Sequence, residues 1–259
     1  MRIISWNVNG LKARLEAVKR LSEELHPDVI CCQKVMTKGN GFITVPGYFT
    51  WWGSMNGGLV GGVSTFMKLW KVIELDSLAN VPKASDWLID TGCLLDLNFE
   101  HFILVNVYFP YSNLSNDEFV KIRQRWDYEI HEYLVKAVRR KPLIVCGDLN
   151  IVSTDLDAWD NVSVKKQGCF LDWEHRNFNS LLESTSLVDS YRYLHPGGRD
   201  FSYFFNNNPE YRLSNQGYRI DYFLVSESLL PYVKKSEILT DVFETTNNLI
   251  LLEIDLPIK

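Results

Sequence analysis

The chain has 259 residues, near the upper end of a single domain, and 46% of them are hydrophobic, so it can bury a large core. Its apolar runs fall well short of the roughly 18 residues of a membrane helix, so we expect no membrane span. The net charge of −5 argues against indiscriminate binding to nucleic acid, although it is compatible with a basic face on an acidic protein. The N-terminus runs directly into a strand pattern, so we expect no signal peptide. We predict one domain over residues 1–259.

The cysteines are odd in number and lack the spacing of metal ligands. Three of the five lie in apolar runs, which predicts reduced and buried thiols. We therefore expect an intracellular protein, cytoplasmic or nuclear. The five residues are Cys31, Cys32, Cys93, Cys146 and Cys169.

The first 32 residues predict a β-α-β unit. Residues 2–8 form a strand, Gly10 allows a turn, and apolar residues at helical spacing follow until Pro27 stops the helix. Residues 29–32 are a second buried strand, so part of the sheet should be parallel. Residues 47–109 then predict successive strands, which glycines separate into antiparallel hairpins, at 48–52, 62–67, 70–75, 87–97 and 102–108.

A long helix is predicted over residues 116–139, where apolar residues form a stripe at helical spacing. A buried strand follows at 143–147, and Asp172 is predicted to be the N-cap of a further helix. The last predicted strands are 219–225, 236–239 and 249–256. No linker or repeat interrupts this order. We therefore predict an α/β fold, a four-layer α/β sandwich of two packed mixed β-sheets flanked by helices.

The buried strand at 143–147 ends in a tight turn that carries Asp148 and Asn150. Residues two apart point the same way, so a carboxylate and an amide lie side by side at a strand end. Such a pair can orient a water molecule or a phosphate, although plain turn chemistry uses the same residues. Three other short apolar strands also carry polar residues at their ends, at 2–10, 105–110 and 217–225.

In this order the four motifs resemble the exonuclease III/apurinic-apyrimidinic (AP) endonuclease branch of the endonuclease–exonuclease–phosphatase superfamily. The resemblance covers nearly the whole chain. It implies a site in which one divalent metal ion and a His–Asp pair cleave a phosphodiester bond. The residues that match are the first-strand asparagine (Asn7), the phosphate-contacting tyrosine (Tyr108), the aspartate that handles the attacking water (Asp148), the phosphate-positioning asparagine (Asn150) and the aspartate that orients the catalytic histidine (Asp221).

Two family motifs are altered. Lys34, in Cys32-Gln33-Lys34-Val35, occupies the position of the glutamate that is the principal metal ligand of the family. An ammonium group cannot bind Mg²⁺ and repels it. Thr246 and Asn247 occupy the positions of the family's Asp-His pair. We therefore expect no metal and no other cofactor, and Mg²⁺ only if the protein is active.

The nucleic-acid surface that the resemblance implies is partly present. Lys12, Arg14, Lys165 and Lys166 match positions that contact the backbone in the family, and Tyr203 and Tyr218 match the aromatic walls of a pocket for a baseless sugar. Such aromatic residues can stack or wedge, but they also pack in ordinary cores. Val60 and Tyr111 replace a tyrosine and an asparagine that are frequent in the family, which weakens the expectation of specificity for damaged DNA.

Three functions are compatible with this sequence. The first is a catalytically inactive homologue that binds DNA, RNA or a regulatory protein partner, because groups that act as a unit in catalysis are lost together. The second is an active Mg²⁺-dependent AP endonuclease or 3′-exonuclease with rearranged ligands. The third is a protein-interaction scaffold that binds no nucleic acid, which the acidic composition permits. We favour the first.

Overall fold

The computed structural model describes residues 1–37, 43–53, 61–75, 81–160, 167–205, 208–241 and 244–256. Its strands are β1 (Arg2–Asn7), β2 (Val29–Gln33), β3 (Tyr48–Trp52), β4 (Val63–Lys68), β5 (Leu94–Asn98), β6 (Ile103–Tyr108), β7 (Leu143–Asp148), β8 (Leu187–Asp189), β9 (Asp221–Ser226), β10 (Val233–Leu239) and β11 (Leu249–Ile254). Its α-helices are α1 (Leu11–Leu25), α2 (Asp86–Asp90), α3 (Asp117–Val138), α4 (Asp172–Thr185), α5 (Ser190–Leu194) and α6 (Pro209–Leu213).

The strands form two mixed sheets. The six-stranded sheet has the order β10-β11-β1-β2-β4-β3, and the five-stranded sheet has the order β5-β6-β7-β9-β8. Within them β1 pairs with β2 and β6 with β7 in parallel, and the other neighbours are antiparallel. The parallel pairs follow from the helical crossovers α1 and α3, because parallel neighbours need a long connection.

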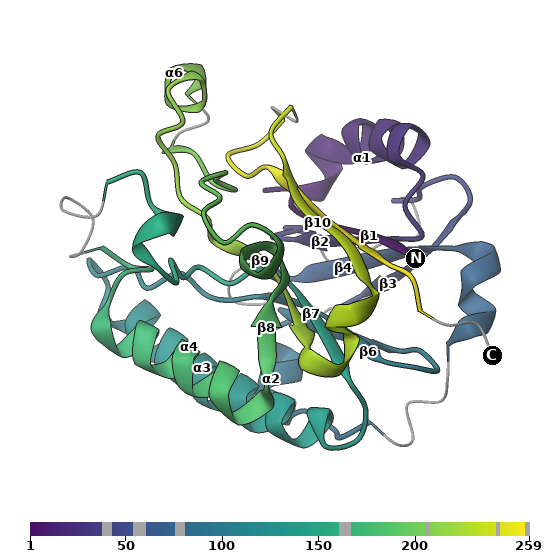
Figure 1. The fold of residues 1–259 in the computed structure, drawn as a ribbon, viewed down its shortest axis with the longest axis horizontal. Coiled ribbons are helices and arrows are strands. Elements are labelled where there is room, and N and C mark those ends of the chain that lie inside the picture. Colours follow the sequence, from purple (N-terminus) through teal and green to yellow (C-terminus); the bar gives the residue numbers. More distant parts are fainter. Residues whose placement is uncertain are drawn as a thin grey trace.

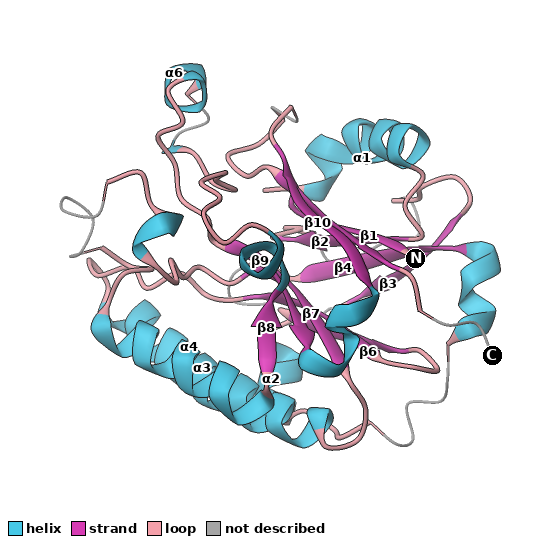
Figure 2. Cartoon of the chain, in the orientation of Figure 1, coloured by secondary structure: helices cyan, strands magenta, loops and turns pink. Residues whose placement is uncertain are grey.

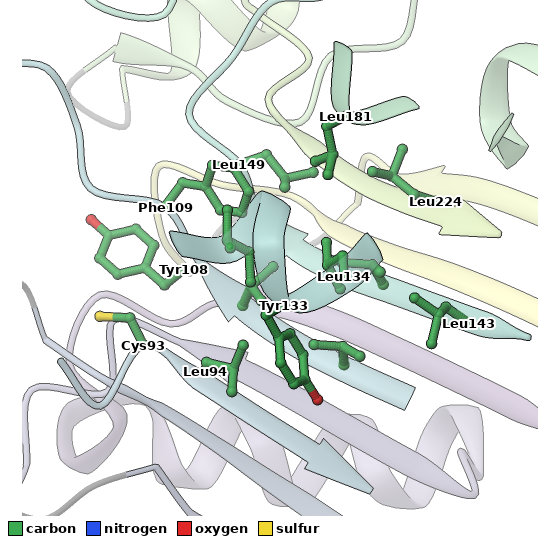
Figure 3. Close-up of a cluster of buried hydrophobic side chains, with 14 of the residues drawn as sticks. Cys93, Leu94, Tyr108, Phe109, Tyr133, Leu134, Leu143, Leu149, Leu181 and Leu224 are labelled. Atoms are coloured by element: carbon green, nitrogen blue, oxygen red, sulfur yellow. The ribbon is translucent and has the colours of Figure 1, made fainter. Parts of the chain in front are cut away.

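The layers are those of the predicted four-layer sandwich, and the fold prediction is confirmed. Helix α1 covers the six-stranded sheet, whereas α3 and α4 cover the outer face of the five-stranded sheet, on the opposite side of the molecule (Figures 1 and 2). Side chains of both sheets, such as Ile3 and Ile144, fill the space between them. Figure 3 shows part of another core, between α3 and the five-stranded sheet, in which Leu134 of α3 packs near Leu143 and Leu224 of the sheet.

Local capping explains several helix boundaries. The side chain of Asn116 accepts a hydrogen bond from the backbone N–H of Glu118 (3.0 Å), so the long helix begins close to the predicted position.

All five cysteines are free and buried, as predicted. None of the helices in the described ranges is long and apolar enough to cross a membrane.

Three local predictions were wrong. The expected strand at 70–75 is a 3-10 helix, Leu69–Glu74, because the partner strand of β4, β3, begins only at Tyr48, opposite Lys68. Beyond this pair the backbone N–H of Leu69 donates to the carbonyl of Gly47 (3.0 Å), in the turn before β3. The expected strand at 87–97 begins instead as α2, and Ser85 caps this helix by accepting a hydrogen bond from Leu88 N (3.1 Å). Asp172 is the first residue of α4 rather than its N-cap.

Strand register brings the polar strand ends together. Tyr108 of β6 pairs with Asp148 of β7, and Asp148 pairs with Asp221 of β9. In the other sheet, Asn7 of β1 pairs with Gln33 of β2. Both sheets therefore present their polar strand ends at a shared edge, which is the usual location of sites in α/β folds.

The end of β7, which carries Asp148, requires glycine at position 147. Gly147 has φ +145°, and a Cβ atom added there would lie 1.9 Å from the carbonyl oxygen of Val107. The backbone of β7 thus approaches β6 more closely than any side chain allows.

We expect Gly147→Ala to lower the free energy of unfolding by at least about 3 kcal/mol, because backbone strain and overpacking add. Urea unfolding followed by circular dichroism measures this loss. Gly197→Ala is the matched control, because Gly197 is exposed and its Cβ would meet nothing within 4 Å. Equal stability of the two variants would contradict this account of the turn.

Candidate functional site

The ends of β1, β2, β6 and β7 open onto one cavity of about 310 Å³. This volume is at the lower end of the range for small-molecule sites. Its polar side is formed by Asn7, Asn9, Lys34, Tyr108, Asp148, Asn150, Thr246 and Asn247. Its aromatic side is formed by Tyr111, Phe170, Tyr203, Phe205 and Tyr218.

Asp148 lies on the floor of the cavity and is 2% exposed. Its Oδ2 accepts a hydrogen bond from Asn7 Nδ2 (2.7 Å), and its Oδ1 accepts one from the backbone N–H of Asn150 (3.0 Å). Burial raises the pKa of Asp148 to about 6, although these hydrogen bonds and the charges of Lys34 and Arg123 act in the opposite direction. The carboxylate is therefore held by donors but poorly hydrated.

Asp221 lies beside Asp148 and just behind the cavity lining. Its Oδ2 accepts a hydrogen bond from Asn247 Nδ2 (2.9 Å), whereas its Oδ1 is buried without a hydrogen-bond partner in the described part of the chain. Burial, and then the negative charge of Asp148, raise the pKa of Asp221 well above its usual value. The pair therefore favours a state in which Asp221 is neutral and Asp148 carries the charge.

Lys34 lines the same cavity, on the turn that follows β2. Its backbone is left-handed, with φ +51°, a conformation that few non-glycine residues adopt. The side chain is half-buried, and its positive charge helps to keep Asp148 ionised.

Asn150 and Tyr108 form a connected pair at the cavity wall. Asn150 has φ +45°, and its Nδ2 donates to the carbonyl of Phe109 (2.8 Å). Burial, and then the negative charge of Asp148, raise the pKa of Tyr108 well above its usual value, against a hydrogen bond with Asn150. The tyrosine is therefore a neutral hydroxyl, and Figure 3 shows this hydroxyl directed away from the apolar core.

The loop before β11 places an amide where the sequence resemblance expects a histidine. Thr246 Oγ1 donates to Asn247 Oδ1 (3.0 Å), so the amide nitrogen is left to donate to Asp221. Trp6 Nε1 donates to the carbonyl of Asn247 (3.1 Å) and fixes the loop. Asn247 has no group that can take a proton from water.

The predicted nucleic-acid residues are only partly brought to the cavity. Tyr203 and Tyr218 line it, with parallel rings whose centroids are 6.4 Å apart. Lys12 is exposed on α1 outside the cavity lining, and Arg14 Nε donates to the carbonyl of Glu244 (2.8 Å). Lys165, Lys166 and Val60 lie outside the described residues. Tyr111 lines the cavity and is 41% exposed.

Sequence reasoning missed a buried charge cluster beneath the cavity. Arg123 of α3 donates to the carbonyls of Pro110 (3.0 Å) and Asn150 (3.1 Å) and pairs with Asp127 at 2.7 Å. Glu174 of α4 accepts from Ser112 Oγ (2.6 Å). The signal was an arginine four residues before an aspartate within the apolar stripe of the helix, where a charged residue needs a buried partner.

The residues present do not fit the divalent metal ion that the sequence resemblance implies. Mg²⁺ requires several oxygen ligands in near-octahedral geometry. Among the residues that the structure describes, no group of three or more His, Cys, Asp or Glu side chains could hold a metal ion. Asp148 instead accepts a hydrogen bond from the amide of Asn7, and the positive charge of Lys34 acts on the same carboxylate.

Comparisons with known proteins show what this chain is similar to. The model of the Endonuclease/Exonuclease/phosphatase family matches residues 4–243. The exodeoxyribonuclease of Bacillus subtilis is 29% identical over 245 residues, which cover 93% of this chain and 94% of that protein. The crystal structure of an AP endonuclease from Leishmania major has a TM-score of 0.86 at 25% identity and covers 99% of this chain and 88% of that chain.

An AP endonuclease from Archaeoglobus fulgidus has a TM-score of 0.84 at 21% identity over 99% of this chain and 100% of that chain, a likeness of fold. The family match spans most of the sequence, and the sandwich and the order of the strand-end motifs are those expected of it. The chain belongs to the endonuclease/exonuclease/phosphatase family and, within it, to the exonuclease III/AP endonuclease group.

Proposed function

We propose that this protein binds nucleic acid in the cavity and does not cleave it. The observation that carries this proposal is the position of Lys34, which lines the same cavity as Asp148 and acts on this carboxylate by its positive charge. A fixed cation there opposes entry of a divalent metal by direct repulsion. Without a metal, the phosphate of a bound strand is not polarised for attack.

The second support is the group that contacts Asp221. Asn247 donates its amide hydrogen to this carboxylate (2.9 Å), which occupies the contact that a histidine needs. An amide can neither accept the proton of an attacking water nor return it to a leaving group. Because the metal ligand and the Asp-His pair of the family act as a unit, their combined replacement by Lys34, Thr246 and Asn247 leaves binding as the remaining activity.

DNA is the first ligand to test. The relatives above are named as an exodeoxyribonuclease and as AP endonucleases. The aromatic side of the cavity supplies ring faces on which a base or sugar can pack, among them Tyr203 and Phe205. RNA is the alternative ligand within this proposal, and a regulatory protein partner is an alternative to it.

We expect the wild-type protein to leave a duplex with one abasic site uncut in the presence of Mg²⁺. Gel electrophoresis of an end-labelled strand measures cleavage, with the exodeoxyribonuclease of Bacillus subtilis as the positive control. Turnover on the order of 1 s⁻¹ or more, typical of enzymes, would overturn the proposal in favour of an active nuclease with rearranged ligands.

Restoring the lost groups should restore cleavage. We expect Lys34→Glu combined with Thr246→Asp and Asn247→His to cut the abasic duplex in the presence of Mg²⁺, because metal, base and orienting groups return together. Lys34→Glu alone should bind metal with little turnover, and the loop pair alone should also stay inactive. A triple variant that folds, binds metal and cuts nothing would show that the loss extends into the binding of substrate.

The salt dependence of binding distinguishes a nucleic-acid-binding protein from a protein-interaction scaffold. Contacts to phosphates release counterions, so the logarithm of the binding constant falls linearly with the logarithm of the salt concentration. Fluorescence anisotropy of a labelled duplex should show this negative slope for the wild-type protein. A protein that binds neither DNA nor RNA at low salt would favour a protein-interaction scaffold.

A further inference from the structure

Lys34 is positioned by the backbone on both sides of its turn. Its carbonyl accepts a hydrogen bond from Gly10 N (2.9 Å), at the start of α1. On the other side, Val35 N donates to Gly62 O (3.2 Å) and Met36 N donates to Gly61 O (2.7 Å). A turn held in this way presents its side chain from a fixed origin, unlike a lysine on an exposed helix.

The neighbouring chain also confines the stem of the lysine. A Cβ atom at Gly61 would lie 3.3 Å from Lys34 Cα and 3.1 Å from Lys34 Cγ, and Gly61 has φ +115°. Gly61 therefore leaves space that the lysine stem uses. This packing restricts the side chain to the cavity side of the turn, where its ammonium influences Asp148.

Three amide side chains of the cavity are already engaged with the protein. Asn7 donates to Asp148, Asn247 donates to Asp221, and Asn150 donates to the carbonyl of Phe109. These amides hold the carboxylates and the wall in place. Among the described residues that line the cavity, Lys34 is the one that carries a positive charge.

We propose that the Lys34 ammonium directly contacts a phosphate group of the bound nucleic acid, so that binding in this cavity needs no divalent metal ion. This inference rests on the proposed function and specifies its ligand contact. A lysine ammonium is a compact point charge that suits a phosphate oxygen. Half-burial strengthens that attraction relative to bulk water, and Tyr203 and Tyr218 provide ring faces for the adjoining sugar or base.

The probe is a fluorescein-labelled DNA duplex with one tetrahydrofuran abasic site. Anisotropy is titrated over a range of KCl concentrations, once with EDTA and once with MgCl₂ at matched ionic strength. We expect the same affinity for the wild-type protein in both buffers. Lys34→Met should bind more weakly, and its slope of log affinity against log salt should be less steep by about 0.9, the effect of one lost phosphate contact.

Matched variants separate charge from structure. Lys34→Arg keeps the charge and should keep the slope, whereas Lys34→Gln should behave as Lys34→Met does. Lys136→Met is the control, because Lys136 is 60% exposed on α3 and pairs with Glu132 on the surface away from the cavity. Methionine is compatible with the turn, since Met36 has the same φ of +51°. Circular dichroism checks that each variant is folded.

The outcomes distinguish the two proposals. A wild-type protein that binds no duplex at low salt overturns the proposed function, and this inference with it. Binding by the wild-type protein that disappears in EDTA overturns the role of Lys34 alone. Folded Lys34→Met and Lys34→Gln variants with the slope of the wild-type protein would do the same, because the phosphate contacts would then lie elsewhere.

Discussion

The repulsion between two buried carboxylates is the constraint around which the site is arranged. The register of β7 against β9 places Asp148 opposite Asp221, and neither side chain is more than 3% exposed. Two neighbouring carboxylates that are both buried are unstable when both are ionised, unless one takes up a proton or positive charges and hydrogen-bond donors compensate them. Donors therefore approach from the other, six-stranded sheet: Asn7 at the end of β1 contacts Asp148, and Asn247 in the loop before β11 contacts Asp221.

The altered residues are consistent with one another in this light. Lys34 adds a positive charge that acts on Asp148. Asn247 gives Asp221 a neutral hydrogen-bond donor, an amide that cannot accept a proton from water. A site built to hold a metal would need its carboxylates free to act as ligands. Here Asp148 accepts a hydrogen bond from Asn7 and Asp221 accepts one from Asn247, so the two aspartates serve as internal hydrogen-bond acceptors.

The sequence carried most of the fold and the strand-end residues, because these depend on local patterns. The apolar strands, the cap at Asn116 and the turn at Gly147 each follow from a few neighbouring residues. The 3-10 helix Leu69–Glu74 depends instead on where the partner strand β3 begins, which the local pattern at 69–74 does not encode. The contacts of Arg123 with Pro110 and Asn150 cross 13 and 27 residues of sequence, so only the tertiary structure reveals them.

The cavity is also maintained by groups that never touch a ligand. Arg123 fixes the carbonyls on which the walls at Tyr111 and Asn150 depend, and Glu174 fixes Ser112 and the backbone N–H of Leu171. Removing one partner of such a buried cluster typically costs about 3–5 kcal/mol, whatever chemistry the cavity performs. The shape of the cavity is therefore coupled to the stability of the fold rather than to cleavage. The proposed exchange of metal ligand and base would thus leave a binding site of unchanged outline, lined by Lys34.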